Sequence, residues 1–269
     1  MKTATNNGRS LPMLGLGVYK ITEQAQMSSA VQCAWDAGYR LFDTAQMYGN
    51  EALLGTALSP FHCFREQYFL TSKLDPSNSS DPAASLHRSL RSLQTDYVDI
   101  FMIHWPGQQQ KRLLRVWAQL EDLCLQGKIR TLGVCNCTPQ HLHWILDNCR
   151  IPPAVHQVEH HPLLNETDLY DLCRSRNICL QAWAPLMRGN LDLPVLQELS
   201  DRYRKSPAQI LLRWNVQQGF SVIPKSVRRD RIFENADIFD FSLSAEDMVL
   251  LDSMHTGQRS GKDPFTYDY

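Results

Sequence analysis

Four ionisable residues stand at or near the ends of short apolar segments, where their types and spacing could support proton transfer. Asp43, Lys73 and His104 each close such a segment, and Tyr48 lies in the stretch that follows Asp43. A tyrosine hydroxyl, with a pKa near 10, is a weak acid at neutral pH. We expect a lysine that is held by Asp43 beside Tyr48 to stabilise the phenolate and to lower the pKa of the tyrosine.

Such a set can protonate the oxygen of a carbonyl, with His104 orienting that oxygen or sharing the proton. The carbonyl carbon then needs a hydride, which no side chain supplies, so a nicotinamide cofactor is implied. Taken singly, Asp43 could cap a helix, Lys73 could be a solvated strand end, and His104 could be a core histidine. If the fold brings several such residues together at the same ends of its strands, the catalytic interpretation is favoured.

A fold that gathers strand ends is indicated by alternating strand and helix patterns. Strands are predicted at residues 40–43, 68–73, 98–104, 131–134, 154–159, 178–183 and 220–224, with another over 13–17 or in an N-terminal hairpin. Helix patterns lie in most of the intervals, and βα units recur about every 25–40 residues. We therefore predict one domain over residues 1–269, an α/β fold of the (β/α)8 TIM barrel type with short substrate loops. No GxGxxG motif follows the first strand, so the Rossmann fingerprint is missing.

Helix ends can be placed from capping residues. Asp81 followed by Pro82 predicts a helix start, and Ser206-Pro-Ala-Gln209 reads as a capping box. A last helix is expected to start at Ser244. In a TIM barrel the active site lies at the C-terminal ends of the strands. Those ends carry polar residues throughout: Asp43, Lys73, His104, Cys135, Asn136, Gln157, Glu159, Trp183, Lys225 and Ser226.

Composition excludes several classes of protein. The 269 residues carry 27 Lys plus Arg against 28 Asp plus Glu, so nothing favours binding to nucleic acid or to an anionic membrane. No apolar run approaches the roughly 20 residues that span a bilayer, and the N-terminus lacks the apolar region of a secretory signal. The eight cysteines include no CxxC pair. We expect a cytoplasmic protein with mostly free, buried thiols.

Over nearly its whole length the chain resembles the aldo-keto reductase superfamily. The matching segments are LPMLGLGVYK (11–20), GYRLFDTAQMYGNE (38–51), LTSKL (70–74), DYVDIFMIHWPG (96–107), GKIRTLGVCNC (127–137), HQVEHHP (156–162), QAWAPL (181–186) and VIPKSVRRDRIFENADIFDF (222–241). The short segment after Trp105 and the short C-terminus are similar to microbial-type glyoxal/methylglyoxal reductases, 2,5-diketogluconate reductases and prostaglandin F synthase-like members.

The resemblance implies roles for single residues. The catalytic tetrad is matched by Asp43, Tyr48, Lys73 and His104, with Tyr48 as general acid and His104 as substrate orienter. Trp183 matches the aromatic residue that stacks on the nicotinamide, and Asn136 and Gln157 match residues that hold its carboxamide. The segment around the adenosine 2′-phosphate and adenine is matched by Lys225, Ser226, Val227, Arg228, Arg231, Glu234 and Asn235. Charge and bidentate geometry at Lys225 and Arg231 suit a phosphate, which favours NADPH (NADP+) over NADH.

Some positions depart from the family pattern. Cys135 replaces a serine that hydrogen-bonds the carboxamide, and a thiol is a weaker partner. His156 stands where asparagine is usual, and Arg228, where a smaller polar residue is common, could strengthen anion binding. Cys135 and Cys137, two residues apart, are expected to point the same way. They could bind a metal or sense redox state, with inert thiols as the alternative.

The resemblance also suggests a substrate pocket and a function. Tyr19, Met47 and Trp105 are expected to wall an apolar pocket, together with Met187, Arg259, Phe265 and Tyr267. We expect a monomeric NADPH-dependent enzyme without a metal that reduces small aldehydes, ketones and dicarbonyls such as methylglyoxal. One alternative is a nicotinamide-binding sensor or regulatory protein with little turnover. Another is a metal-dependent hydrolase that uses Asp43, His104 and the pair His160-His161.

Overall fold

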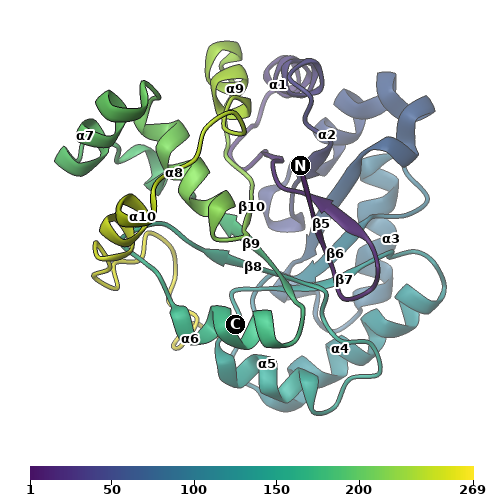
Figure 1. Cartoon of the computed structure of the whole chain (residues 1–269). Helices are drawn as coiled ribbons and strands as arrows, with labels where there is room; N and C mark the ends of the chain where they lie inside the picture. Colours follow the sequence, from purple (N-terminus) through teal and green to yellow (C-terminus); the bar gives the residue numbers. More distant parts are fainter.

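The computed structural model describes residues 1–269, and eight parallel strands form its centre (Figure 1). These strands are β3 (Leu16–Gly17), β4 (Leu41–Asp43), β5 (Phe69–Leu74), β6 (Ile100–Ile103), β7 (Leu132–Cys135), β8 (Val155–Glu159), β9 (Cys179–Trp183) and β10 (Ser221–Val222). Each strand pairs with the next one along the chain. A parallel bridge between Leu14 and Val222 joins the two ends of the sheet, and the Gly17 amide donates to the Pro224 carbonyl at 3.1 Å. The sheet therefore closes, and the predicted (β/α)8 barrel is confirmed.

Ten helices surround the strands (Figure 1). They are α1 (Gln24–Asp36), α2 (Glu51–Leu58), α3 (Pro82–Leu93), α4 (Gln110–Leu125), α5 (Pro139–Leu146), α6 (Thr167–Ser175), α7 (Pro194–Tyr203), α8 (Pro207–Gln217), α9 (Arg229–Ala236) and α10 (Ala245–Asp252). Helix α2 was not predicted, and it contains Gly55, which weakens a helical pattern. The glycine is needed for packing, because a Cβ at this position would lie 2.5 Å from the Ser92 carbonyl oxygen on α3. None of the ten helices is both long and apolar enough to cross a bilayer.

An antiparallel hairpin covers the N-terminal end of the barrel. It consists of β1 (Lys2–Ala4) and β2 (Ser10–Pro12), and Figure 1 shows it in dark purple, crossing the strands. The side-chain nitrogen Nδ2 of Asn6 donates to the Pro153 carbonyl, just before β8, at 2.9 Å. The hairpin thus closes the end of the barrel where the strands begin. The opposite end, which we call the mouth, is the one that carries the polar residues.

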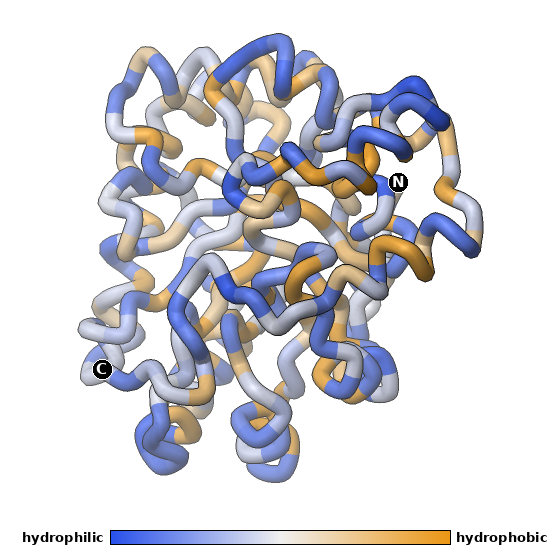
Figure 2. Tube along the Cα trace, turned by 90° about the vertical axis from the view of Figure 1, so that its left-hand side faces the viewer, coloured by the Kyte–Doolittle hydropathy of each residue, from blue (hydrophilic) through white to orange (hydrophobic).

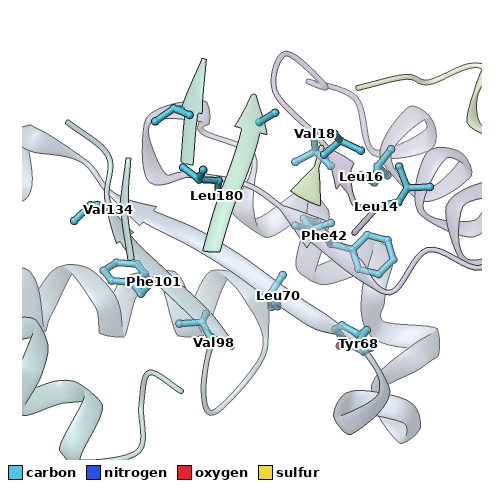
Figure 3. Packing of buried hydrophobic residues seen from close by; sticks show 14 of the residues in the cluster. Leu14, Leu16, Val18, Phe42, Tyr68, Leu70, Val98, Phe101, Val134 and Leu180 are labelled. Carbon is cyan, nitrogen blue, oxygen red and sulfur yellow. The ribbon is translucent and has the colours of Figure 1, made fainter. Parts of the chain in front are cut away.

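Side chains alternate between the inside and the outside of the barrel along each strand. On β6, Ile100 and Met102 belong to a small cluster inside the barrel, whereas Phe101 and Ile103 belong to the large cluster between strands and helices. Figure 3 shows part of the large cluster, with Phe101 among its labelled residues. Figure 2 shows hydrophobic stretches, in orange, running through the middle of the molecule and hydrophilic stretches, in blue, at many of the outer turns. Inward positions nearer the mouth are polar instead.

We predict that Ser206→Ala lowers the free energy of unfolding by about 1 kcal/mol, because it removes an N-cap. The predicted capping box is confirmed at the start of α8: Ser206 Oγ accepts from the Gln209 amide at 3.3 Å, and Gln209 Oε1 accepts from the Ser206 amide at 2.9 Å. Urea unfolding measures the change. Ser175→Ala is the control, since its exposed hydroxyl donates only to the Leu172 carbonyl. Equal losses in both variants would contradict the role of the cap.

Candidate active site

Strand pairing sets Asp43 and Lys73 beside each other inside the barrel. Asp43 on β4 is level with Thr71 on β5, so Lys73 lies two residues nearer the mouth on the same face. The Lys73 side chain is fully buried, and its ammonium donates to Asp43 Oδ1 at 2.6 Å, to the Thr44 carbonyl at 2.9 Å and to Tyr48 Oη at 3.4 Å. All three N–H bonds of the ammonium therefore have partners, and one of these partners is the tyrosine.

The Lys73 ammonium stays charged because Asp43, its partner in an ion pair, compensates for its burial. Burial by itself lowers the pKa of Lys73, but the charge of Asp43, with smaller contributions from Tyr48 and Cys135, raises this pKa above its usual value. The second carboxylate oxygen of Asp43 accepts from Gln157 Nε2 at 2.8 Å. Removing either member would leave an unpaired charge in the barrel.

The phenol of Tyr48 is held at the mouth by a short helical turn, Gln46–Tyr48, that ends at Gly49 in a left-handed conformation. Its ring contacts the ring of Tyr19, with centroids 4.9 Å apart, and that of His104 at 5.6 Å. Burial raises the pKa of Tyr48 to about 12, and Lys73 lowers it by a smaller amount. The expectation of a lowered pKa was therefore right about the effect of Lys73 but wrong about the result, because desolvation dominates.

His104 follows β6 and is neutral at pH 7. Burial, followed by the charges of Lys73 and Lys262, lowers the pKa of His104 well below its usual value. Its Nδ1 atom is buried without a hydrogen-bond partner in the protein. Its carbonyl oxygen accepts from Asn136 Nδ2 at 3.1 Å. A neutral imidazole beside a tyrosine hydroxyl can orient a carbonyl oxygen without carrying the proton itself.

The residues expected near the nicotinamide lie together at the mouth. Trp183 is half-buried, and its Nε1 donates to Asn136 Oδ1 at 2.8 Å. Cys135 Sγ lies 3.7 Å from Gln157 Oε1. Gln157 Nε2, however, donates to Asp43 and, at 2.7 Å, to Gln181 Oε1 inside the barrel. This amide therefore positions the ion pair in addition to any role toward a cofactor.

Gln181 is a site residue that was not predicted from the sequence. It lies on β9, fully buried, and links Gln157 to Ser221 on β10, whose Oγ is 3.3 Å from Gln181 Nε2. A signal for it existed, because it is a polar residue within an otherwise apolar strand, two residues before Trp183 and hence on the same face.

The segment expected to contact the 2′-phosphate and adenine surrounds the start of α9. Lys225 and Arg231 are exposed, Ser226 and Asn235 are buried, and Val227 and Glu234 are partly buried. The N-cap of α9 is Arg228, which provides no side-chain cap, and Asp230 places a carboxylate in the first turn of this helix. Arg228 Nη2 is 2.6 Å from Asp230 Oδ2, and this pair reduces what Arg228 itself can add to anion binding.

Three of the expected pocket walls lie around Tyr48. Tyr19 and Met47 are 47% and 43% exposed, and Trp105 is buried, with the ring of Tyr267 packed on it at 4.9 Å. Two other expectations are wrong. Met187 packs into the cluster formed with α7 and α8, and Arg259 forms an ion pair with Glu166 at 2.5 Å, so neither side chain walls the pocket. Phe265 is 57% exposed.

Cys135 and Cys137 do not point the same way, contrary to expectation. Asn136 between them has a left-handed backbone, with φ of 57°, which breaks the alternation of a strand. Cys135 packs inside the barrel and Cys137 in the outer cluster. Burial raises the pKa of both thiols, to about 12 for Cys135, which makes them poorly reactive.

The two neighbouring histidines proposed as ligands in a metal-dependent hydrolase have other side-chain partners in the structure. His160 stacks on Phe220 with centroids 3.8 Å apart, and its Nδ1 lies 2.7 Å from Asn215 Oδ1. His161 Nε2 lies 3.2 Å from Glu159 Oε1. No three His, Cys, Asp or Glu side chains are arranged to hold a metal ion.

We predict that Lys73→Met lowers the free energy of unfolding by about 3–5 kcal/mol, since it leaves the Asp43 carboxylate buried without its cation. The double variant Asp43→Asn with Lys73→Met contains no unpaired charge and should recover part of this loss. Urea unfolding compares the variants, and the double variant remains informative if the single one does not fold. A double variant no more stable than Lys73→Met would contradict the ion-pair account.

Comparison with known proteins agrees with this geometry. The sequence model of the Aldo/keto reductase family matches residues 13–256. Glyoxal reductase of Bacillus subtilis (strain 168) is 42% identical over 262 residues, which cover 96% of this chain and 94% of that protein. Methylglyoxal reductase DkgA of Yersinia pestis is 40% identical, with the same coverage of both chains. A mutant of Gox0644, whose crystal structure contains NADPH, superimposes with a TM-score of 0.94 at 32% identity, covering 100% of this chain and 99% of that one. The chain therefore belongs to the aldo/keto reductase family and is an oxidoreductase.

Proposed function

We propose that this enzyme uses NADPH to reduce small aldehydes and ketones, including dicarbonyls such as methylglyoxal, with Tyr48 as the general acid. The observation that carries the proposal is the fully buried Lys73 ammonium, which is bonded at once to Asp43 and to the Tyr48 hydroxyl. The names of the two relatives, a glyoxal reductase and a methylglyoxal reductase, support the substrate class.

The residues present fit NADPH. Around the start of α9, the exposed side chains of Lys225 and Arg231 offer two cations for a 2′-phosphate. At the mouth, the half-exposed ring of Trp183 lies beside Asn136, where a nicotinamide ring can stack. The NADPH found in the Gox0644 structure supports the same cofactor here. When bound, NADPH supplies the hydride that reaches the carbonyl carbon.

The protein's own residues handle the carbonyl oxygen and its proton. The oxygen binds between the Tyr48 hydroxyl and neutral His104, whose ring centroids are 5.6 Å apart. Tyr48 holds its proton at neutral pH and gives it to the oxygen as negative charge develops there. Lys73 then lies 3.4 Å from the resulting phenolate oxygen and stabilises it, while Asp43 fixes Lys73 in place. Solvent returns the proton to Tyr48.

We also propose that the chain acts alone as a monomer. Its exposed large apolar side chains are scattered over separate elements, such as Leu125 on α4, Phe233 on α9 and Val249 on α10. A stable subunit interface would gather such residues into one apolar patch.

We predict that Tyr48→Phe lowers kcat for methylglyoxal by about 10²–10⁴-fold, because the general acid is lost. Saturating NADPH and a stopped-flow or steady-state absorbance assay give the rate, and quenching of tryptophan fluorescence checks that NADPH still binds. Tyr19→Phe is the matched control, since it loses a hydroxyl from the neighbouring ring and should keep most of the activity. A Tyr48→Phe enzyme that retains most of its rate would contradict the assignment.

We predict that kcat/KM for reduction does not change between pH 6 and 8. His104 has a pKa well below its usual value and is neutral throughout this range, and Tyr48, with its raised pKa, remains protonated. A group with a raised pKa loses its proton only at higher pH, so any fall in rate belongs on the alkaline side. A break near pH 6.5 that disappears in His104→Gln would show that this histidine titrates.

A further inference from the structure

The C-terminal tail, residues 259–269, is tied down on two sides of the mouth. On one side the backbone amides of Ser260 and Gly261 donate to the Glu159 carboxylate, at the end of β8, at 2.6 and 3.2 Å. On the other side Gln108 Nε2, in the loop after β6, donates to the carbonyls of Pro264 and Tyr267, each at 3.0 Å. The residues between these anchors, including Lys262, therefore span the mouth from β8 to β6.

The tail also contacts the aromatic residues of the site. Gly261 packs so closely on Trp183 that a Cβ would lie 2.4 Å from its Cη2 atom. Further along, Tyr267 packs on Trp105, the residue that follows His104. Lys262 lies between these contacts, with its ammonium 3.7 Å from the centroid of the Tyr267 ring. The ring thus holds a cation on the wall of the expected substrate pocket.

The Lys262 ammonium has no counter-ion in the protein. The acidic side chains of the tail and its anchor are already paired: Asp263 with Arg259 at 3.6 Å, Asp268 with Arg112 at 2.5 Å, and Glu159 with His161 at 3.2 Å. Lys262 itself is exposed and forms no ion pair and no hydrogen bond, and its ammonium contacts only the Tyr267 ring. Its charge reaches the site, since it contributes to the lowered pKa of His104. An unpaired cation that faces a reaction site is available to an anionic group of a substrate.

We propose that Lys262 selects carbonyl substrates that carry a carboxylate at the end remote from the reacting carbonyl. The inference rests on the proposed function, which places the carbonyl oxygen between Tyr48 and His104. The rest of the substrate then extends along Trp105 toward Tyr267, where the ammonium of Lys262 lies. Lys262 does not touch the reacting atoms, so it determines specificity and takes no part in the chemical step.

Two aldehydes that differ in charge and by one methyl group test the proposal at saturating NADPH. 4-Carboxybenzaldehyde carries the carboxylate, and methyl 4-formylbenzoate is its neutral ester. Lys262→Gln should lower kcat/KM for the carboxylate by about 3- to 5-fold, mainly through KM, and leave the ester unchanged, as expected for one solvent-exposed ion pair. Lys262→Glu should lower it further and Lys262→Arg should preserve it. Added salt should reduce the preference of the wild type for the carboxylate.

Lys2→Gln is the matched control, because Lys2 is exposed on the hairpin at the opposite end of the barrel and its loss changes the net charge equally. It should leave the ratio of the two kcat/KM values as in the wild type. If both aldehydes are reduced and Lys262→Gln leaves that ratio unchanged, the role of Lys262 is overturned while the proposed function stands. If methylglyoxal is reduced but neither of these aldehydes is, this inference is overturned while the proposed function stands. If none of the three is reduced, the proposed function fails, and this inference fails with it.

Discussion

The ion pair between Lys73 and Asp43 is the interaction on which the rest of the site depends. Both side chains are buried inside the barrel, where an unpaired charge costs several kcal/mol. The pair is tolerated because every N–H of the ammonium and both carboxylate oxygens have partners. One of those partners is the Tyr48 hydroxyl, so the hydrogen bonding that stabilises the buried lysine also fixes the position of the tyrosine that we propose as the general acid.

A chain of side-chain hydrogen bonds extends from Asp43 into the barrel wall. Gln157 connects Asp43 to Gln181, and Gln181 connects to Ser221 on the last strand. These residues all lie at inward positions near the mouth, above the apolar cluster that contains Ile100 and Met102. The barrel is therefore apolar at the hairpin end and polar at the mouth. This division allows an ionic site to form without exposing the core to water.

Much of this arrangement could be predicted from the sequence, because alternation along strands and caps at helix starts are local signals. The strand ends at Asp43, Lys73 and His104 were predicted, and the barrel brings them together. Other features depend on tertiary packing. The net effect on the Tyr48 pKa is set by burial from several elements, and the opposite directions of Cys135 and Cys137 follow from one left-handed residue. Helix α2 was missed because Gly55, required by packing on α3, weakens its pattern.

The short loops of this chain give its C-terminal tail a large part in shaping the mouth. The amides of Ser260 and Gly261 donate to Glu159, and Tyr267 packs on Trp105. One segment therefore lies across the mouth from β8 to β6. The path of the tail decides which charge faces the substrate. Sequence periodicity cannot reveal this path, since the tail contains no regular element and is held by side chains far from it in the chain.

We propose that the site performs carbonyl reduction and does not only bind the nicotinamide. The most direct test mixes the purified wild-type protein with NADPH and methylglyoxal and follows both the loss of absorbance at the cofactor's reduced band and the alcohol product. We expect sustained turnover, one product molecule for each NADPH oxidised, and slower turnover with NADH. Tight NADPH binding without turnover of methylglyoxal or of a broad panel of carbonyl compounds would contradict it and would favour a sensor or regulatory protein.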